Sequence, residues 1–372
     1  MQNMTKVCYI SPLSIHSQRW IEAFSNKGYD MSLIADSRGW VTPEMLPFPT
    51  YSLSLLDIGN FLWRFMPNTA KIVTILKRID PDFVHLHVQH HYMPAIALSS
   101  LPFILSSWGI EVLRLPYSNM RARIEKNLAK MVAIKARVII ADAECLKEIW
   151  VGLGIPETKI EVIPFGVDVK IFDPDVDGQS IREQFQISKK DIVVISTRPF
   201  YNHQYNVECL IEAIPSIIKT CENVKFIIKG SGPLEKYLKN LAKKLEVTEH
   251  VHFSGLVPYN KIPQFLSAAD IYVSTCFVDS TSVSLLEAMA CKLAPVVTDI
   301  PGNREWIRDS VNGFMFPPRN KAVLAEKIIH LAENKKLRDI FGRRCVDTVK
   351  KRATWEHCVS KMQAVYETLL KR

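Results

Sequence analysis

Several features are missing from this sequence, and each absence excludes a class of protein. No window holds eighteen consecutive apolar residues, so we expect no helix that spans a bilayer. The opening stretch, MQNMTKVCYISPL, has a short apolar run but no signal-peptide core, so we do not expect export. No segment of low complexity interrupts the chain. We therefore expect a globular protein of the cytoplasm.

Paired cysteines are missing as well. The eight cysteines are scattered, and none forms a C-x-x-C pair. This spacing is typical of reduced, buried thiols and argues against a disulfide framework or a zinc site. No nucleic-acid recognition motif accompanies the basic charge, which argues against nucleic acid as a partner.

The size and charge of the chain indicate two domains and an anionic partner. At 372 residues the chain exceeds one ordinary core, and 48% apolar with 23% charged residues is normal for a globular protein. The net charge of +9 is concentrated in two segments. Residues 112–137 carry seven Lys or Arg against one acid, and residues 319–352 carry eleven against four. Such patches favour a membrane surface or a phosphorylated substrate, and the alternative is a solvated helix face.

Short β-rich runs alternate with helical patterns along the whole chain. Unbroken apolar strands separated by helices indicate parallel sheets that are covered on both faces. The expected strands are residues 6–11, 31–36, 82–87, 103–108, 137–142, 159–164, 191–197, 224–230, 251–255, 271–276 and 295–299. Each half holds enough units for a doubly wound sheet, so we predict an α/β protein with two Rossmann-like domains.

A turn-rich stretch, residues 165–180, separates the two halves and is the expected linker. We place the first domain at residues 1–170 and the second at 171–353. Residues 354–372 have a strong amphipathic helical pattern, and we expect this helix to cross back to the first domain. Ligands of such sheets bind at the carboxyl ends of the strands, so we expect the site between the domains.

The stretch 279-DSTSVSLLEAMA-290 places two acids eight residues apart around the expected start of a buried helix. The structural interpretation is a capping box, in which Ser284 caps the helix and Glu287 folds back onto its terminus. That interpretation leaves Asp279 unexplained. In the functional interpretation, the helix start suits a phosphate and the flanking carboxylates accept hydrogen bonds from sugar hydroxyls. A nucleotide-activated sugar is a ligand with both parts.

The longer segment 279–302, DSTSVSLLEAMACKLAPVVTDIPG, closely resembles the donor-binding signature of the retaining GT-B glycosyltransferases of family four. Further segments resemble this family in order and spacing: 162-VIPFGVD-168, 227-IIKGSGP-233, 252-HFSGLVP-258, 270-DIYVSTC-276 and 311-VNGFMFPP-318. The resemblance covers the C-terminal half throughout and the first half loosely. It implies a GT-B fold with an acceptor-binding first domain and a donor-binding second domain.

The resemblance also implies an activity and roles for individual residues. The expected reaction moves a sugar from a UDP- or GDP-sugar to a glycan or lipid-linked acceptor, with retention at the anomeric carbon. Asp279 would hold sugar hydroxyls, Glu287 the ribose, and Arg198 the pyrophosphate, to which a fixed guanidinium is suited. The remaining donor-binding residues implied are Thr281, Ser282, Val283, Gly230, Gly232 and Val257. The nucleotide sugar is a substrate, so no cofactor and no metal are expected.

The sequence departs from the family pattern at two donor positions. Asp279 stands where the family usually has Glu, and the shorter side chain leaves the identity of the sugar open. His203 stands where the family usually has Lys, five residues after Arg198, and a partly protonated His is a weaker clamp for phosphate.

The acceptor half departs further. Its first β–α loop, 10-ISPLSIHSQRW-20, lacks the usual paired glycines. Ser14 and His16 are candidate acceptor contacts there, and the alternative is a capped helix start. The family's His-Gly appears as Trp108-Gly109, where Trp108 either stacks on an acceptor sugar or packs in the core. His91 is a further candidate for acceptor contact.

Two segments resemble metal sites. In 85-HLHVQHH-91, His85 and His87 share a strand face, but no acid lies within the run, so satisfied buried imidazoles are the alternative. The acids of 173-DPDVD-177 lie in the expected linker beside Pro174, which indicates a turn. We favour the structural interpretation for both.

A membrane surface is the last candidate partner. Trp63, Phe65 and Met66, together with the basic segment 114–137, resemble the surfaces of peripheral enzymes at the inner face of a membrane, and core packing is the alternative for the apolar group. Polysaccharide or glycolipid biosynthesis is the setting that these features favour. Two other functions remain open: a nucleotide-sugar isomerase or hydrolase on the same fold, and a non-catalytic nucleotide-sugar-binding protein.

Overall fold

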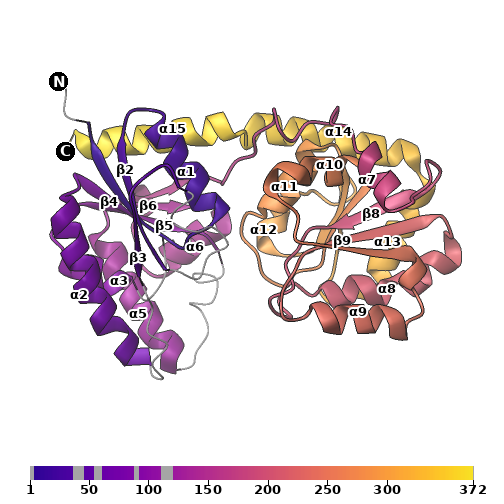
Figure 1. The fold of residues 1–372 in the computed structure, drawn as a ribbon, viewed down its shortest axis with the longest axis horizontal. Coiled ribbons are helices and arrows are strands. Elements are labelled where there is room, and N and C mark those ends of the chain that lie inside the picture. The colour runs from indigo at the N-terminus through magenta and orange to yellow at the C-terminus, as the bar shows by residue number, and fades with distance from the viewer. Residues whose placement is uncertain (1–3, 37–45, 54–60, 88–91, 110–119, 372) are drawn as a thin grey trace. The chain divides into compact units, whose positions relative to one another are not determined.

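The chain forms two compact units in this computed structural model, which describes residues 4–36, 46–53, 61–87, 92–109 and 120–371 (Figure 1). Unit 1 comprises Met1–Pro164 together with Val359–Arg372, and unit 2 comprises Phe165–Cys358. Each unit consists of a parallel sheet with helices on its faces (Figure 1). The predicted α/β fold with two doubly wound sheets is therefore confirmed.

The sheet of unit 1 has seven parallel strands in the order β3-β2-β1-β4-β5-β6-β7. The strands are β1 Lys6–Ile10, β2 Asp30–Asp36, β3 Thr50–Leu53, β4 Phe83–His87, β5 Phe103–Ser107, β6 Val138–Ala141 and β7 Ile160–Val162. The helices are α1 Ile15–Ser25, α2 Phe61–Ile79, α3 Met93–Leu98, α5 Met120–Lys135 and α6 Glu144–Gly152. The central strands are buried on both faces, as their unbroken apolar sequences require.

The sheet of unit 2 has six parallel strands in the order β10-β9-β8-β11-β12-β13. The strands are β8 Ile192–Ser196, β9 Val224–Lys229, β10 Val251–Gly255, β11 Ile271–Ser274, β12 Ala294–Thr298 and β13 Phe314–Phe316. The α-helices are α7 Gln179–Gln184, α8 Val207–Thr220, α9 Glu235–Lys244, α10 Ile262–Ser267, α11 Val283–Ala290, α12 Pro301–Arg304, α13 Lys321–Glu333 and α14 Lys335–Arg352. One face packs against α8 and α13, and the other packs against α10 and α11.

The sequence did not predict two strands, β3 and β13, and both lie at an edge of their sheet. An edge strand is short and has one partner, so it does not need the unbroken apolar run by which the central strands were found. β13 has only three residues, and the middle one is partly exposed.

The last helix, α15 Trp355–Leu370, begins in unit 2 and ends in unit 1, as expected. Its start is held within unit 2, where the main chain of Val167 bonds to Ala353 and Trp355. Its end contributes Tyr366, which is fully buried in unit 1. The hydroxyl of Tyr366 lies 2.7 Å from that of Tyr9 on β1.

Candidate functional site

The candidate donor site lies at the carboxyl edge of the unit 2 sheet. β8 and β11 are neighbours in this sheet, so the loops that follow them meet. The loop after β8 carries Arg198, and the loop after β11 leads through Asp279 to the start of α11. Residues 81 positions apart in sequence, Arg198 and Asp279, therefore form an ion pair.

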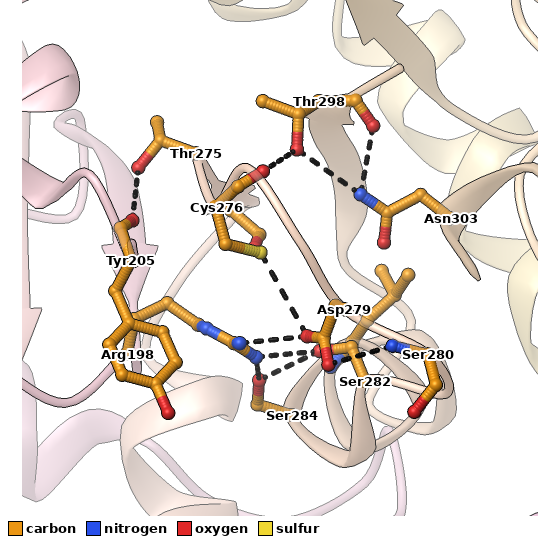
Figure 2. Close-up of polar contacts among 12 residues, drawn as sticks. Arg198, Tyr205, Thr275, Cys276, Asp279, Ser280, Ser282, Ser284, Thr298 and Asn303 are labelled. Carbon is orange, nitrogen blue, oxygen red and sulfur yellow. Dashed lines mark hydrogen bonds and ion pairs between the residues drawn. The ribbon is translucent and has the colours of Figure 1, made fainter. Parts of the chain in front are cut away.

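Arg198 joins three side chains of the 279–284 segment (Figure 2). Its Nη2 donates to Asp279 Oδ2 at 2.7 Å. Its Nη1 donates to the hydroxyls of Ser282 at 2.8 Å and Ser284 at 3.1 Å. These bonds fix the guanidinium at the first turn of α11.

The side chain of Arg198 is almost completely shielded from solvent. Only 7% of the residue is exposed, and its guanidinium lies 5.0 Å from the ring centroid of Tyr205. Its Nε has no partner among the described residues, so the group keeps some donor capacity. Nearby, burial raises the pKa of the Cys276 thiol against the opposing effect of Arg198, so this thiol is neutral at pH 7. The charged groups facing each other here are therefore Arg198 and Asp279.

The predicted capping box at Ser284 and Glu287 is wrong. The helix begins two residues earlier than that prediction requires, with Ser282 as its N-cap and Val283 as its first residue. The Ser282 hydroxyl accepts from the main-chain N–H of Leu285, whereas the Ser284 hydroxyl lies 2.8 Å from that of Tyr272. The Ser284 hydroxyl accepts a hydrogen bond from Arg198 and contacts the hydroxyl of Tyr272, and Ser284 itself lies within the helix, so it does not cap the helix.

The start of α11 has the geometry of an anion site. Thr281 and Ser282 are buried, at 4% and 2% exposed, and Val283 is partly buried. The first N–H groups of a helix lack partners within the helix and carry the positive end of its dipole. A guanidinium beside such a helix start gives a positive centre suited to phosphate oxygens.

Glu287 lies in the second turn of α11 and is 5% exposed. Lys229, the last residue of β9, lies near enough for the negative charge of Glu287 to affect its pKa. Burial lowers the pKa of Lys229, and the negative charge of Glu287 acts in the opposite direction. The second acid of the motif is thus a buried carboxylate with a lysine in its neighbourhood.

Two glycines allow loops of the site to approach closely. A Cβ on Gly230 would lie 2.4 Å from the carbonyl oxygen of Arg198, and one on Gly302 would lie 2.0 Å from that of Ser280. Gly232 follows in the same turn with φ near +148°. The glycines of both motif segments are therefore required by packing against the Arg198 and Asp279 loops.

Two other predicted donor residues lie outside the Arg198 cluster. The side chain of His203 is 66% exposed, and its Nδ1 lies 2.7 Å from Glu208 Oε1. Val257 follows β10 and packs partly buried against the core on the α10 and α11 face of the sheet. The structure thus brings Arg198, Asp279, Ser282 and Ser284 together, and it does not bring His203 to them.

Sequence reasoning missed two residues of this region. The ring of Tyr205 lies 5.0 Å from the guanidinium of Arg198, and Lys229, at the end of β9, is near enough to Glu287 for the two charges to interact. A signal for Lys229 was present, because a lysine ends an otherwise apolar strand just before a glycine turn. The position of Tyr205 had no local signal, since it depends on how the loop after β8 folds.

In unit 1 the predicted acceptor residues lie in the loops after β1 and β5. Ser14 is the N-cap of α1, and it forms a capping box with Ser17. This is the capped helix start that the sequence left as an alternative. His16 is half-buried in the first turn of α1, and its burial, with Arg19 nearby, lowers its pKa to about 4.

Trp108 and Gly109 follow β5. The Trp108 ring packs against the ring of His87, with 3.5 Å between the centroids, and Gly109 has φ near +123°. The Nδ1 of His87 lies 2.8 Å from the hydroxyl of Ser11, which follows β1. His91, the remaining acceptor candidate, lies outside the described residues.

The histidines of β4 take part in a buried hydrogen-bond network. His85 uses both ring nitrogens, with Nδ1 2.6 Å from Tyr366 Oη and Nε2 2.6 Å from Ser106 Oγ. Such satisfied imidazoles are the alternative that the sequence raised against a metal site. The main chain after Asp173 and Asp177 donates back to their carboxylates, as in turns. In the described part of the chain, no group of three or more His, Cys, Asp or Glu could hold a metal ion.

The membrane candidates are only partly described. The side chains of Trp63, Phe65 and Met66 lie outside the described residues. Among the helices that the structure describes, none is long and apolar enough to cross a bilayer.

Comparison with known families covers nearly the whole chain. Residues 13–171 match the family model "Glycosyltransferase Family 4", and residues 177–345 match "Glycosyl transferases group 1". The chain belongs to the group 1 glycosyltransferases. In this glycosyltransferase the second matched segment contains all six strands of the unit 2 sheet, and the first contains the strands of the unit 1 sheet other than β1.

Individual relatives of this glycosyltransferase are distant. An uncharacterised glycosyltransferase of Methanocaldococcus jannaschii is 23% identical over 96% of this chain and 94% of its own length. A second one from that organism is 26% identical over 66% of this chain but only 62% of its own length. The crystal structure of Anabaena HepE with UDP and glucose has a TM-score of 0.81 at 18% identity, covering 98% of this chain and 99% of that one. The GT-B fold is therefore shared along the whole described chain.

Proposed function

We propose that the protein is a retaining, metal-independent glycosyltransferase that moves a sugar from a UDP- or GDP-sugar to a glycan or lipid-linked acceptor. The observation that carries the proposal is the fixed guanidinium of Arg198 at the start of α11, paired with Asp279. The family membership and the UDP and glucose in the related HepE structure support the donor class.

In this proposal the donor site acts by holding the nucleotide sugar in place and by stabilising negative charge. Arg198 and the main-chain N–H groups of Thr281, Ser282 and Val283 would bind the pyrophosphate and stabilise the negative charge that grows as the nucleotide leaves. Because Arg198 is already held by three side chains, little reorganisation is needed when this charge develops. Glu287 would accept hydrogen bonds from the ribose hydroxyls, and Asp279 from the sugar.

No described side chain of this cluster is suited to a covalent step. The Cys276 thiol is neutral and 3.8 Å from Asp279 Oδ2, and Asp279 is bound by Arg198. The resemblance to the retaining family implies a front-face displacement, and we propose this mechanism here, in which the departing phosphate takes the proton of the acceptor hydroxyl. The bond from the anomeric carbon to the phosphate breaks, and the bond to the acceptor oxygen forms on the same face.

A panel of donors tests the proposal. Purified protein is titrated with UDP, GDP and their common sugar derivatives while its melting temperature is recorded, because a ligand that binds the native state raises it with concentration. The release of nucleoside diphosphate is then followed with and without p-nitrophenyl glycosides and detergent-dispersed phospholipids as acceptors. Release that depends on an acceptor, with retained configuration in the product, is expected.

Other outcomes separate the remaining functions. Rapid release without any acceptor would indicate a hydrolase, and conversion of the sugar alone would indicate an isomerase. Binding without turnover under every condition would indicate a non-catalytic protein.

The role of Glu287 has its own test. Glu287→Gln keeps the shape but loses the charge, so nucleoside diphosphate should bind at least about tenfold more weakly, since hydrogen bonds to charged groups contribute roughly 1.5–3 kcal/mol. With a 2′,3′-dideoxy nucleotide the wild type and the variant should bind equally. A difference that persists with the dideoxy ligand would remove Glu287 from the ribose site.

A further inference from the structure

A basic cavity lies at the amino edge of the unit 1 sheet, the edge opposite the candidate acceptor residues. Its volume is about 480 Å³, and it is lined by residues 99–103, 134–137 and Lys159. These segments follow α3 and α5 and precede β5, β6 and β7. Three of the lining residues, Lys135, Arg137 and Lys159, are cations, and none is an acid.

The helix ends beside the cavity explain part of this charge. Lys135 Nζ donates to the carbonyl of Ala97 at 2.8 Å, and Lys159 Nζ donates to that of Ile134. These carbonyls end α3 and α5, and a helix end carries about half a negative charge. Two such ends offset only about one of the three positive charges.

The remaining charge has no described counter-ion. Among the residues that the structure describes, no acid lies within ion-pair distance of Lys135, Arg137 or Lys159. Burial, and then the repulsion of Arg137, lowers the pKa of Lys159. Like charges are thus held together here, and an anion in the cavity would relieve the repulsion.

Exposed apolar side chains lie at and beside the cavity in sequence. Ile134 lines the cavity and is 56% exposed, Leu98 directly precedes the lining residue Ser99 and is 75% exposed, and Met131, one turn before Ile134 on α5, is 46% exposed. Large apolar side chains exposed beside a cationic pocket are the combination found where proteins contact an anionic membrane surface. These side chains favour a lipid over a free ion as the source of the anion.

We propose that this cavity binds the phosphate of an anionic phospholipid headgroup, with Arg137 and Lys159 on the phosphate and Leu98 and Ile134 at the level of the first acyl carbons. The planar guanidinium of Arg137 can bind two phosphate oxygens at once. The cavity is of a size that holds a small polar group such as glycerol phosphate. It is formed within unit 1 alone, so it does not depend on the donor site or on the function proposed above.

A vesicle sedimentation experiment tests the proposal. The full chain is mixed with phosphatidylcholine vesicles that contain or lack phosphatidic acid. The test variant is Arg137→Ala with Lys159→Met, which removes two charges, and the matched control is Arg123→Ala near the other end of α5. That control lies about 18 Å along the helix from Lys135, beyond a Debye length of about 8 Å.

The wild type should bind the phosphatidic acid vesicles and not the pure phosphatidylcholine ones. The double variant should bind about thirtyfold more weakly, because each basic residue at the membrane surface contributes about a fivefold preference and two are removed. The Arg123→Ala control, which lies away from the cavity, should bind within twofold of the wild type. Unchanged melting temperatures and an unchanged thermal response to nucleotide would show that both variants are folded.

Three results would overturn the proposal. The first is equal binding by the wild type and the double variant. The second is a loss of about fivefold in the Arg123→Ala control, the effect expected of any one basic residue at the surface, which would indicate diffuse surface charge. The third comes from a soluble arm with sn-glycerol 3-phosphate and inorganic phosphate: if the double variant loses only these ligands while vesicle binding is unchanged, the source is a free phosphate and not a lipid.

Discussion

The carboxyl edges of the two sheets are built from opposite kinds of polar contact. In unit 2 the edge is charged, with Arg198 paired to Asp279 at the start of α11. In unit 1 the polar contacts of β4 are between neutral groups, with His87 bonded to Ser11 and His85 bonded to Tyr366 and Ser106, and we call this part of the sheet the neutral edge, although the buried Asp142 follows β6 nearby in the sheet. Both arrangements are buried, so both keep their geometry without a ligand.

This difference follows from what each edge is proposed to bind. A pyrophosphate must be neutralised, and a fixed cation at a helix start does this with little rearrangement. A neutral hydroxyl acceptor needs only hydrogen bonds and apolar contact. The charged edge therefore rests on a few strong pairs, while the neutral edge depends on several buried groups that must stay uncharged.

The largest effect is expected from a substitution that removes the charged pair of unit 2. Arg198→Ala leaves Asp279, whose side chain is 18% exposed, without its counter-ion. Removing one partner of a buried pair destabilises by roughly 3–5 kcal/mol, so urea unfolding should show a loss of about 3 kcal/mol or more. Nucleoside diphosphate binding, measured by calorimetry, should also disappear.

An exposed pair in the same unit provides the control. Arg304 lies 2.6 Å from Asp299, and its side chain is 59% exposed. Arg304→Ala should lower the free energy of unfolding by about 1 kcal/mol or less. Equal losses in the two variants would mean that burial does not distinguish the Arg198 pair.

An intermediate effect is expected when the pH is lowered, and the loss of stability should be greatest in unit 1. Burial lowers the pKa of His85 to about 3, and that of His87 also lies well below its usual value. Between pH 6.5 and the folded-state pKa the unfolded chain binds a proton that the folded chain does not, so stability falls as the pH falls through this window. From pH 7 to 5 each buried histidine should lower the free energy of unfolding by about 2 kcal/mol.

Hydrogen exchange with mass spectrometry, corrected for intrinsic rates, distinguishes the units. Peptides of β1, β4 and β5 should lose protection at pH 5 more than those of β8 and β11. In unit 2, burial also lowers the pKa of His252, but this residue is only half-buried, so a smaller change is expected there. A larger loss of protection in unit 2 would show that its carboxylates, rather than the histidines of unit 1, determine acid stability.

The smallest effect concerns His203, which stands where the family usually has a lysine. Its side chain is 66% exposed and already bound to Glu208, so His203→Ala should change the Kd of nucleoside diphosphate less than about threefold. Glu208→Ala, which releases the imidazole, is the matched variant. A tenfold loss in His203→Ala would place this residue on the phosphates and make the charged edge larger than Arg198 and α11.

The fold and the charged edge were largely predictable from sequence. The central strands appear within a few residues of their predicted positions, because burial on both faces requires unbroken apolar runs. The family resemblance assigned Arg198 and Asp279 to the same donor, and the structure places them together because they follow the neighbouring strands β8 and β11. The predicted helix cap was wrong, because Ser282 rather than Ser284 caps α11.

The neutral edge was less predictable. The histidines of β4 were recognised as candidates for buried, satisfied groups, but the sequence gives no sign that Tyr366, 281 residues away, is the partner of His85. The basic segment around α5 was evident as a run of charge. That Lys159 lines the same cavity as residues of this segment was not evident, because Lys159 directly precedes β7 and reaches the cavity only when β7 pairs at the edge of the sheet.

By itself, the sequence determined the central strands of both sheets and the presence of two sheet-bearing halves, because these depend on local periodicity, and it singled out one short motif as the candidate for donor binding. Only the tertiary structure decided which serine caps α11, which tyrosine lies beneath Arg198 and which hydroxyl satisfies His85. Those choices depend on the packing of side chains from distant strands, where a shift of one residue exchanges one polar partner for another.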